Sequence, residues 1–287
     1  MNISTEYLQL FRTIGNQISI PRVCNIYLPL PVDETEKKDQ FGFVILQDGS
    51  AGAFYTSLGD SLGYLRNKYP DGETVNQQCL SLIEGFSDES IAIRAVALGA
   101  INAASQHIMR RAGYLPFSDK KIQVKSTGVN KPEAGDRIGM IGYFAPLIER
   151  LLAKNINVLV LEKIPERVEL QSGLQLTEDV SDLKNCDHIL CTASTLINQT
   201  LEEVLSHSHD AKSFSLIGPS SSSLPDVLFS HGVNSVGGFH FHDSPAIKQA
   251  LIDQLPWGDA GTKYQLVPET YPGIEVLLKM INLKETG

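Results

Sequence analysis

The stretch at 136–162 constrains the fold of this chain most strongly, because it has the pattern of one complete strand, helix and strand. A short apolar run at 138–141 predicts a buried parallel strand, and Gly142 allows the sharp turn that follows it. Pro146 stands in the first turn of a predicted helix whose apolar residues recur at helical spacing. A second apolar run at 156–161 predicts the next strand. The stretch therefore predicts the first β–α–β unit of a mostly parallel sheet.

Glu162 directly follows the second predicted strand and is a candidate cofactor-binding residue. It lies about 20 residues after Gly142, the separation at which dinucleotide-binding units carry the acid that holds a ribose hydroxyl. The glycine fingerprint of such units is incomplete, because Tyr143 and Phe144 stand where its third glycine would be. The alternative function that this spacing leaves open is an enzyme that uses a nucleotide cofactor, either NAD or S-adenosylmethionine.

Three further apolar runs, at 188–191, 213–217 and 233–236, predict three more strands, and small polar residues follow each of them. The carboxyl ends of parallel strands meet at one edge of a sheet, where ligands bind at the switch in strand order. We therefore expect the loops after these strands to form one ligand-binding site. Its candidate residues are Gly142, Tyr143, Thr192, Ser194, Thr195, Asn198, Gly218, Ser220, Ser221, Gly237 and Gly238.

The chemistry of these loops favours an anion or a polar small molecule. They combine hydroxyl groups with backbone amides at predicted helix starts, and we expect four of these amides to face a common point. The four belong to Gly142, Ser194, Gly218 and Gly237. The competing interpretation is that turns before helices contain glycine, serine, threonine and proline only to cap those helices. Four such loops on one edge favour a binding site.

His240 and His242 are the candidate metal ligands. They alternate in the segment after the fifth predicted strand, so that both side chains would point the same way, and Asp243 adds a carboxylate. No spacing in the chain matches a structural zinc module, a nucleophile elbow or a phosphate-binding loop. The cofactor is therefore unknown from the sequence, with a transition metal or a metal chelate as the candidates, and catalysis is left undecided.

The first 115 residues predict a smaller α+β domain. Apolar runs at 41–46 and 51–55 flank Asp48 and Gly49, which is the pattern of a β-hairpin with a tight turn. Residues 90–111 are rich in alanine and apolar on nearly all sides, which predicts a buried helix at the centre of this domain. The chain is thus predicted to be a two-domain α/β protein. Its parts are an α+β domain at 1–115, a linker at 116–135, and a mostly parallel, Rossmann-like domain with a helical tail at 136–287.

Composition excludes several classes of partner. The net charge is −9 at pH 7 and no stretch is strongly basic, so neither a nucleic acid nor an anionic membrane is expected as a partner. The first residues lack the basic start and apolar core of a signal peptide, which predicts a cytoplasmic protein. Four cysteines give no disulfide framework. An apolar stripe at 274–281 would pack on the first domain or on a second subunit, which leaves a homodimer open.

Four segments carry a resemblance to a known family. They are 136–144, 192–198, 217–220 and 236–238, and together they resemble a family of unknown function that is described by heavy-metal chelation. The resemblance implies a first domain similar to the N-terminal domain of enolase and a Rossmann-like second domain. It also implies a protein that binds a metal ion or a metal-bearing small molecule, such as a corrinoid or a pterin. At Ala193 the chain departs from the family, in which a glycine is expected.

Overall fold

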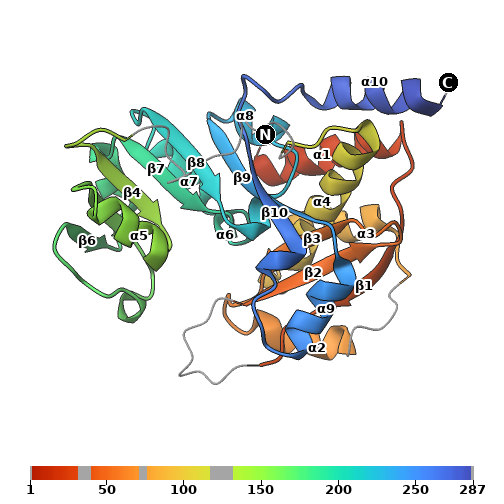
Figure 1. Ribbon diagram of the computed structural model, residues 1–287, viewed down its shortest axis with the longest axis horizontal. Coiled ribbons are helices and arrows are strands. Elements are labelled where there is room, and N and C mark those ends of the chain that lie inside the picture. The colour runs from red at the N-terminus through yellow and green to blue at the C-terminus, as the bar shows by residue number, and fades with distance from the viewer. Residues whose placement is uncertain (1, 32–39, 71–75, 117–131, 286–287) are drawn as a thin grey trace.

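The computed structural model describes residues 2–31, 40–70, 76–116 and 132–285. Its largest element is a seven-stranded sheet in the order β10-β9-β8-β7-β4-β5-β6 (Figure 1). Neighbouring strands are parallel except β9 and β10, which pair antiparallel. The strands are β4 (Arg137–Ile141), β5 (Asn157–Leu161), β6 (Leu174–Thr177), β7 (His188–Thr192), β8 (Ser213–Ile217), β9 (Ser235–Phe241) and β10 (Gly261–Leu266).

The strand order shows where a ligand can bind. Counted from β4, the parallel strands lie in the order 3-2-1-4-5-6, which is the order of a doubly wound dinucleotide-binding sheet. The chain extends the sheet from β4 toward β5 and β6, and then places β7 on the opposite side of β4. The switch point therefore lies between β4 and β7. The predicted α/β fold with a mostly parallel sheet is confirmed.

Alternate residues of the parallel strands enter two different cores, because side chains on a strand point to opposite faces. On one face, Met140 and Val160 pack with Ile148 of helix α5 (Ala145–Leu152). On the other face, Ile189 belongs to a buried cluster that also contains apolar residues from the first half of the chain. One side of the sheet is thus covered by α5, and the other side shares its core with the first half.

The first half folds around a three-stranded antiparallel sheet in the order β1-β2-β3. The predicted hairpin is confirmed, and Gly49 has the positive φ of +85° that its tight turn requires. The central helix α4 packs so closely on β3 that a Cβ atom at Gly52 would lie 2.2 Å from the carbonyl oxygen of Gly99. The elements are α1 (Ile3–Gly15), β1 (Val23–Tyr27), β2 (Phe41–Leu46), β3 (Ala51–Tyr55), α2 (Ser61–Lys68), α3 (Cys79–Ile83), η2 (Glu84–Ser87) and α4 (Ile91–Ala112).

Strand β9 is longer than predicted, because it continues to Phe241 where the sequence predicts a loop from Gly237 onward. Gly238 belongs to this strand for a steric reason, since a Cβ atom there would lie 2.5 Å from the ring of Tyr264 on β10. Gly238 therefore makes room for a neighbouring strand, and the glycine pair lies within β9 and does not form a turn. The sequence pattern also misses β6 and β10 themselves.

Short helices connect the later strands, and the tail returns to the first half. The apolar stripe of α10 contributes Leu277 and Ile281 to the core and packs on α4 (Figure 1). The remaining elements are α6 (Ser194–Ile197), α7 (Leu201–Ser206), α8 (Asp226–Ser230), α9 (Ser244–Ile252), α10 (Ile274–Glu285), η3 (Pro165–Arg167), η4 (Val180–Asn185), η5 (Pro219–Ser221) and η6 (Gly258–Ala260).

Most of the predicted linker at 116–135 lies outside the described residues, which omit 117–131, so the domain boundaries stay a prediction. One buried cluster includes residues of α1, α4, β7 and β8. The two halves therefore share a core. Within the parts of the chain that the structure describes, no helix combines the length and the apolar character that a membrane span requires.

Candidate ligand-binding site

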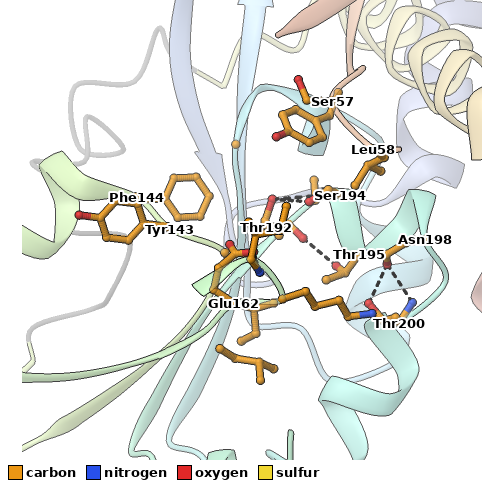
Figure 2. A pocket seen from close by; sticks show the side chains of 18 of the residues that line it. Ser57, Leu58, Tyr143, Phe144, Glu162, Thr192, Ser194, Thr195, Asn198 and Thr200 are labelled. Carbon is orange, nitrogen blue, oxygen red and sulfur yellow. Dashed lines mark hydrogen bonds between the residues drawn. The ribbon is translucent and has the colours of Figure 1, made fainter. Parts of the chain in front are cut away.

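A cavity of about 670 Å³ lies at the switch point of the large sheet. Its walls come from the loops after β4, β5, β7 and β8 and from the first half of the chain. Figure 2 shows Tyr143 and Phe144 on one side of it and Ser57 and Leu58 on another, with Thr192 between them. The cavity therefore forms where the carboxyl edge of the parallel strands meets the first half, and this edge is where open α/β sheets bind ligands.

Most of the predicted ligand-binding residues line this cavity, and three do not. Ser221 is fully buried, and its hydroxyl group donates to the carbonyl oxygens of Gly218 and Gly237. Gly237 and Gly238 lie inside β9. The predicted residues that the structure brings together are Gly142, Tyr143, Glu162, Thr192, Ser194, Thr195, Asn198, Gly218 and Ser220.

The first half contributes a wall that the sequence does not predict. Phe41 and Tyr55 are paired across β2 and β3, with ring centroids 5.5 Å apart, and residues 57–59 follow β3 into the cavity wall. The hairpin pattern was the only sequence feature that bears on the position of this wall. It fixes the pairing of the two strands but not which of their ends faces the larger sheet.

The end of β7 and the segment after it supply four hydroxyl groups to the cavity wall, from Thr192, Ser194, Thr195 and Thr200. Thr192 Oγ1 and Ser194 Oγ lie 2.9 Å apart, and Thr195 Oγ1 donates a hydrogen bond of 2.7 Å to the carbonyl oxygen of Thr192 (Figure 2). Asn198 Oδ1 accepts hydrogen bonds from the backbone N–H and the hydroxyl group of Thr200, at 3.2 and 2.7 Å. The oxygen of Asn198 is thus used within the loop, and its amide nitrogen is the group that this side chain offers to a ligand.

Ser220 gives the strongest sign of a ligand. It is only 2% exposed, and among the described residues its hydroxyl oxygen has no hydrogen-bond partner. Its carbonyl oxygen accepts a hydrogen bond of 2.8 Å from Asn102 Nδ2, which also donates to the carbonyl oxygen of Ala53 on β3. A buried hydroxyl group without a partner costs about 1–3 kcal/mol. We therefore expect this group to bond a ligand or a water molecule, because Ser220 belongs to the cavity wall.

Two of the four loop amides that were expected to bind an anion donate hydrogen bonds within the protein. The N–H of Gly142 donates to the carbonyl oxygen of Leu161 at 3.0 Å, and the N–H of Ser194 donates to Thr192 Oγ1 at 3.3 Å. Gly237 does not line the cavity. The prediction that four amides converge on one point is therefore wrong, and the cavity offers side-chain groups instead.

Carboxylates outnumber cationic groups around the cavity. Glu162 is half-buried and its Oε1 accepts a hydrogen bond of 3.0 Å from the N–H of Ile164. Arg167 Nη1 lies 3.4 Å from the hydroxyl group of Tyr55, which connects the β5–β6 segment to the first half. Among the described residues, the charged side chains that line the cavity are Glu162, Lys163, Arg167, Glu169, Glu178 and Glu203.

The two predicted metal ligands lie away from the cavity. His240 is in β9, opposite Thr262 of β10, and its Nδ1 lies 2.7 Å from Gln106 Oε1. His242 is exposed, and neither histidine lines the cavity. In the part of the chain that the structure describes, no group of three His, Cys, Asp or Glu side chains could hold a metal ion. The structure thus gives these histidines no third ligand.

A second polar cluster lies at the opposite, amino edge of the sheet, and no sequence motif marks it. Asp136 accepts hydrogen bonds from Lys212 Nζ at 2.9 Å and from His188 Nε2 at 3.2 Å. His188 Nδ1 lies 2.7 Å from Ser213 Oγ, and Lys212 Nζ lies 3.0 Å from Asp187 Oδ1. These groups satisfy one another across the starts of β4, β7 and β8.

The fold and the cavity together define a class: an α/β protein with a mostly parallel sheet in the doubly wound strand order and a cavity at its carboxyl edge. The model of the DUF364 family, described as "Putative heavy-metal chelation", matches residues 129–254. The resemblance to this family is thereby confirmed, since the matched part contains all four segments that carry it. It spans the sheet from β4 to β9 and the helix α9.

Two solved structures of DUF364 proteins of unknown function share the fold. The one from Pyrococcus horikoshii is 19% identical with a TM-score of 0.62, and the one from Desulfitobacterium hafniense DCB-2 is 16% identical with a TM-score of 0.63. Each comparison covers 92% of this chain and 98% of the other. The uncharacterized protein MJ0500 of Methanocaldococcus jannaschii is 24% identical over 179 residues, which cover 62% of this chain and 65% of that protein, just under two thirds.

Proposed function

We propose that the protein binds a small molecule that carries a metal ion, in the cavity at the carboxyl edge of the large sheet. The observation that supports this most directly is Ser220, which lines the cavity and whose buried hydroxyl group has no partner among the described residues. The volume of about 670 Å³ is that of a small-molecule site, since such sites measure roughly 300–1,000 Å³. The description of the matching family supports the metal.

A metal chelate suits this cavity better than a bare ion. A bare transition-metal ion needs several protein ligands, and the described residues contain no group of three that could hold one. A chelate brings its own donor atoms, so the protein has only to bind its periphery. The hydroxyl groups of Thr192 and Ser194 and the amide of Asn198 would bond its polar atoms, while Tyr143 and Phe144 would contact an apolar face.

The direct test is to identify what the protein retains. Protein purified without an affinity tag is analysed for metals by inductively coupled plasma mass spectrometry, and the molecules released on denaturation are identified by mass spectrometry. We expect one metal and one organic ligand in comparable amounts. Ser220→Ala should lower the retained amount, whereas Ser87→Ala, an exposed site outside the cavity, should not. Native protein that retains and binds no metal-bearing molecule would contradict the proposal.

An enzyme that uses a nucleotide cofactor is the second candidate. It is favoured by Glu162, which lines the cavity at the end of β5, where dinucleotide-binding sheets carry the ribose-binding acid. Tyr143 and Phe144 oppose it, because they fill the turn that a pyrophosphate must approach closely. If it holds, NAD or S-adenosylmethionine should bind, and Glu162→Ala should weaken binding by about 1–3 kcal/mol. Calorimetry that detects neither compound on the native protein would remove this candidate.

A further inference from the structure

The charged side chains around the cavity favour a ligand that carries a positive charge. Among the described residues, four glutamates line it against one lysine and one arginine, so its formal balance is negative. In the described part of the chain neither Glu162 nor Glu203 is neutralised by an ion pair. A cleft lined by one sign of charge concentrates ligands of the opposite sign.

The hydrogen-bonding groups of the cavity also favour a positively charged ligand. Sites for phosphate and other anions are usually built from free backbone amides at helix starts. Here the amides of Gly142 and Ser194 already donate within the protein, to Leu161 and Thr192. The polar groups that remain are mainly hydroxyl groups, which accept hydrogen bonds as readily as they donate them, together with the side-chain amide of Asn198 and the N–H of Gly218. Ser220 is only 2% exposed, and its oxygen has no partner among the described residues.

Resting on the proposed function, we infer that the cavity selects a cationic metal complex and rejects phosphate-bearing and other anionic ligands. Glu162 and Glu203 are the residues that set this specificity, because they approach the cavity from the end of β5 and the first turn of α7. Ser220 Oγ accepts a hydrogen bond from the complex. The incomplete dinucleotide fingerprint agrees with this selectivity, because a cavity that rejects phosphates has no need of it.

The net charge of the whole chain makes a matched control necessary. At −9, the protein attracts any cation weakly over its entire surface. Glu149→Gln removes one negative charge from an exposed position on α5 that does not line the cavity. Glu203→Gln removes the same charge from the cavity wall. The difference between these two variants isolates the contribution of the cavity from that of the net charge.

The test uses two inert complexes that contain the same metal and carry opposite charges, hexaamminecobalt(III) and hexacyanocobaltate(III). Each is titrated into the full-length protein at low salt, with isothermal titration calorimetry for affinity and amide chemical shifts for position. We expect the cationic complex to shift the amides of the loops at 192–198 and 218–220. Glu203→Gln should weaken its binding about threefold or more, and Glu149→Gln by less than about 1.5-fold. The anionic complex should leave these amides unshifted.

Three outcomes would overturn the inference. They are binding of the anionic complex in the cavity, equal effects of Glu203→Gln and Glu149→Gln, and absence of both complexes from the cavity. The proposed function is judged separately, by the molecule that the native protein retains. A retained metal-bearing anion would leave the proposed function standing and refute the charge selection alone.

Discussion

The two edges of the seven-stranded sheet use buried polar residues in opposite ways. At the amino edge, Asp136 bonds Lys212 and His188, and His188 bonds Ser213, so each group has a partner. At the carboxyl edge, Ser220 is as buried as His188, at 2% against 6% exposure, yet its hydroxyl group has no partner within the described residues. A satisfied cluster stabilises the fold, whereas an unsatisfied buried group costs free energy until something binds it. Whether a buried polar group has a hydrogen-bond partner thus distinguishes the amino edge, where such groups stabilise the fold, from the carboxyl edge, where one is left for a ligand.

Asp136→Ala should have the largest effect, and it tests the amino edge. The substitution removes the acceptor of Lys212 and leaves the ring N–H of His188 buried without a partner, so Tm should fall by roughly 5–10 °C. Affinity for the cavity ligand should change by less than about twofold, because the two sites lie at opposite ends of the strands and share no partner. Scanning calorimetry and ligand titration measure the two quantities. Asp210→Ala, at a side chain that is 75% exposed, serves as the control. If Asp136→Ala lowered both Tm and ligand affinity, the two edges of the sheet would not have separate roles.

The same cluster should be visible as acid sensitivity. The hydrogen bond from Lys212, helped by the backbone N–H of Glu133 and by His188, lowers the pKa of Asp136 from its ordinary 3.8 to about 2. Because the folded-state pKa lies below the unfolded one, ionised Asp136 stabilises the fold above about pH 4, and this contribution is lost as the pH falls toward 2. Between pH 5 and pH 2, the Tm of the native protein should therefore fall more steeply than that of Asp136→Asn. Parallel Tm curves would show that the ionised carboxylate contributes nothing.

Ser220→Ala tests the other edge and should reverse the pattern. It removes a hydroxyl group that has no partner among the described residues, so Tm should change by less than about 2 °C. Affinity for the cavity ligand should fall about fivefold, the value of one net hydrogen bond of about 1 kcal/mol. Ser221→Ala is the matched neighbour, because its hydroxyl group bonds the carbonyl oxygens of Gly218 and Gly237. Ser221→Ala should lower Tm and have a smaller effect on ligand affinity. Equal changes in the two variants would contradict the assignment of a ligand-binding role to the hydroxyl group of Ser220.

The fold was predictable from sequence where the signals are local. The hairpin around Gly49 and the first β–α–β unit match the structure because turn chemistry and apolar spacing lie within a few dozen residues. Strand β10 was not predictable, because apolar and polar residues alternate only weakly along it and its pairing with β9 depends on tertiary packing. Gly238 shows the difficulty. A pair of glycines is typical of a turn, but here the ring of Tyr264 on the neighbouring strand requires a residue without a Cβ atom.

The candidate site was predictable in outline and not in its details. The rule that parallel strands present their carboxyl-end loops at one edge locates Gly142, Thr192 and Gly218 around one cavity. The rule does not say which hydroxyl groups remain unbonded. Ser220 and Ser221 are adjacent serines in one short helical turn, and only the backbone geometry of η5 directs Ser221 to two carbonyl oxygens and leaves the hydroxyl group of Ser220 without a partner among the described residues.

The smallest effect on the cavity is expected from the histidines of the β9 region. His240 bonds Gln106 at 2.7 Å, and burial, followed by the nearby charge of His242, lowers the pKa of its imidazole, so the ring is neutral at pH 7. Neither histidine lines the cavity. Combining His240→Ala with His242→Ala should therefore leave affinity for the cavity ligand within about twofold at both pH 5.5 and pH 7.5.

Metal-binding imidazoles would behave differently, because protonation below about pH 6.5 competes with the metal. Calorimetry of the native and doubly substituted proteins at the two pH values separates these cases. His240→Ala alone should still lower Tm by a few degrees, since Gln106 loses a buried partner, while exposed His242→Ala should not. If native affinity falls in acid and the double substitution abolishes that fall, then β9 supplies ligands to the site. The carboxyl edge would then hold a metal through protein side chains, and its unpartnered hydroxyl group would no longer be its defining feature.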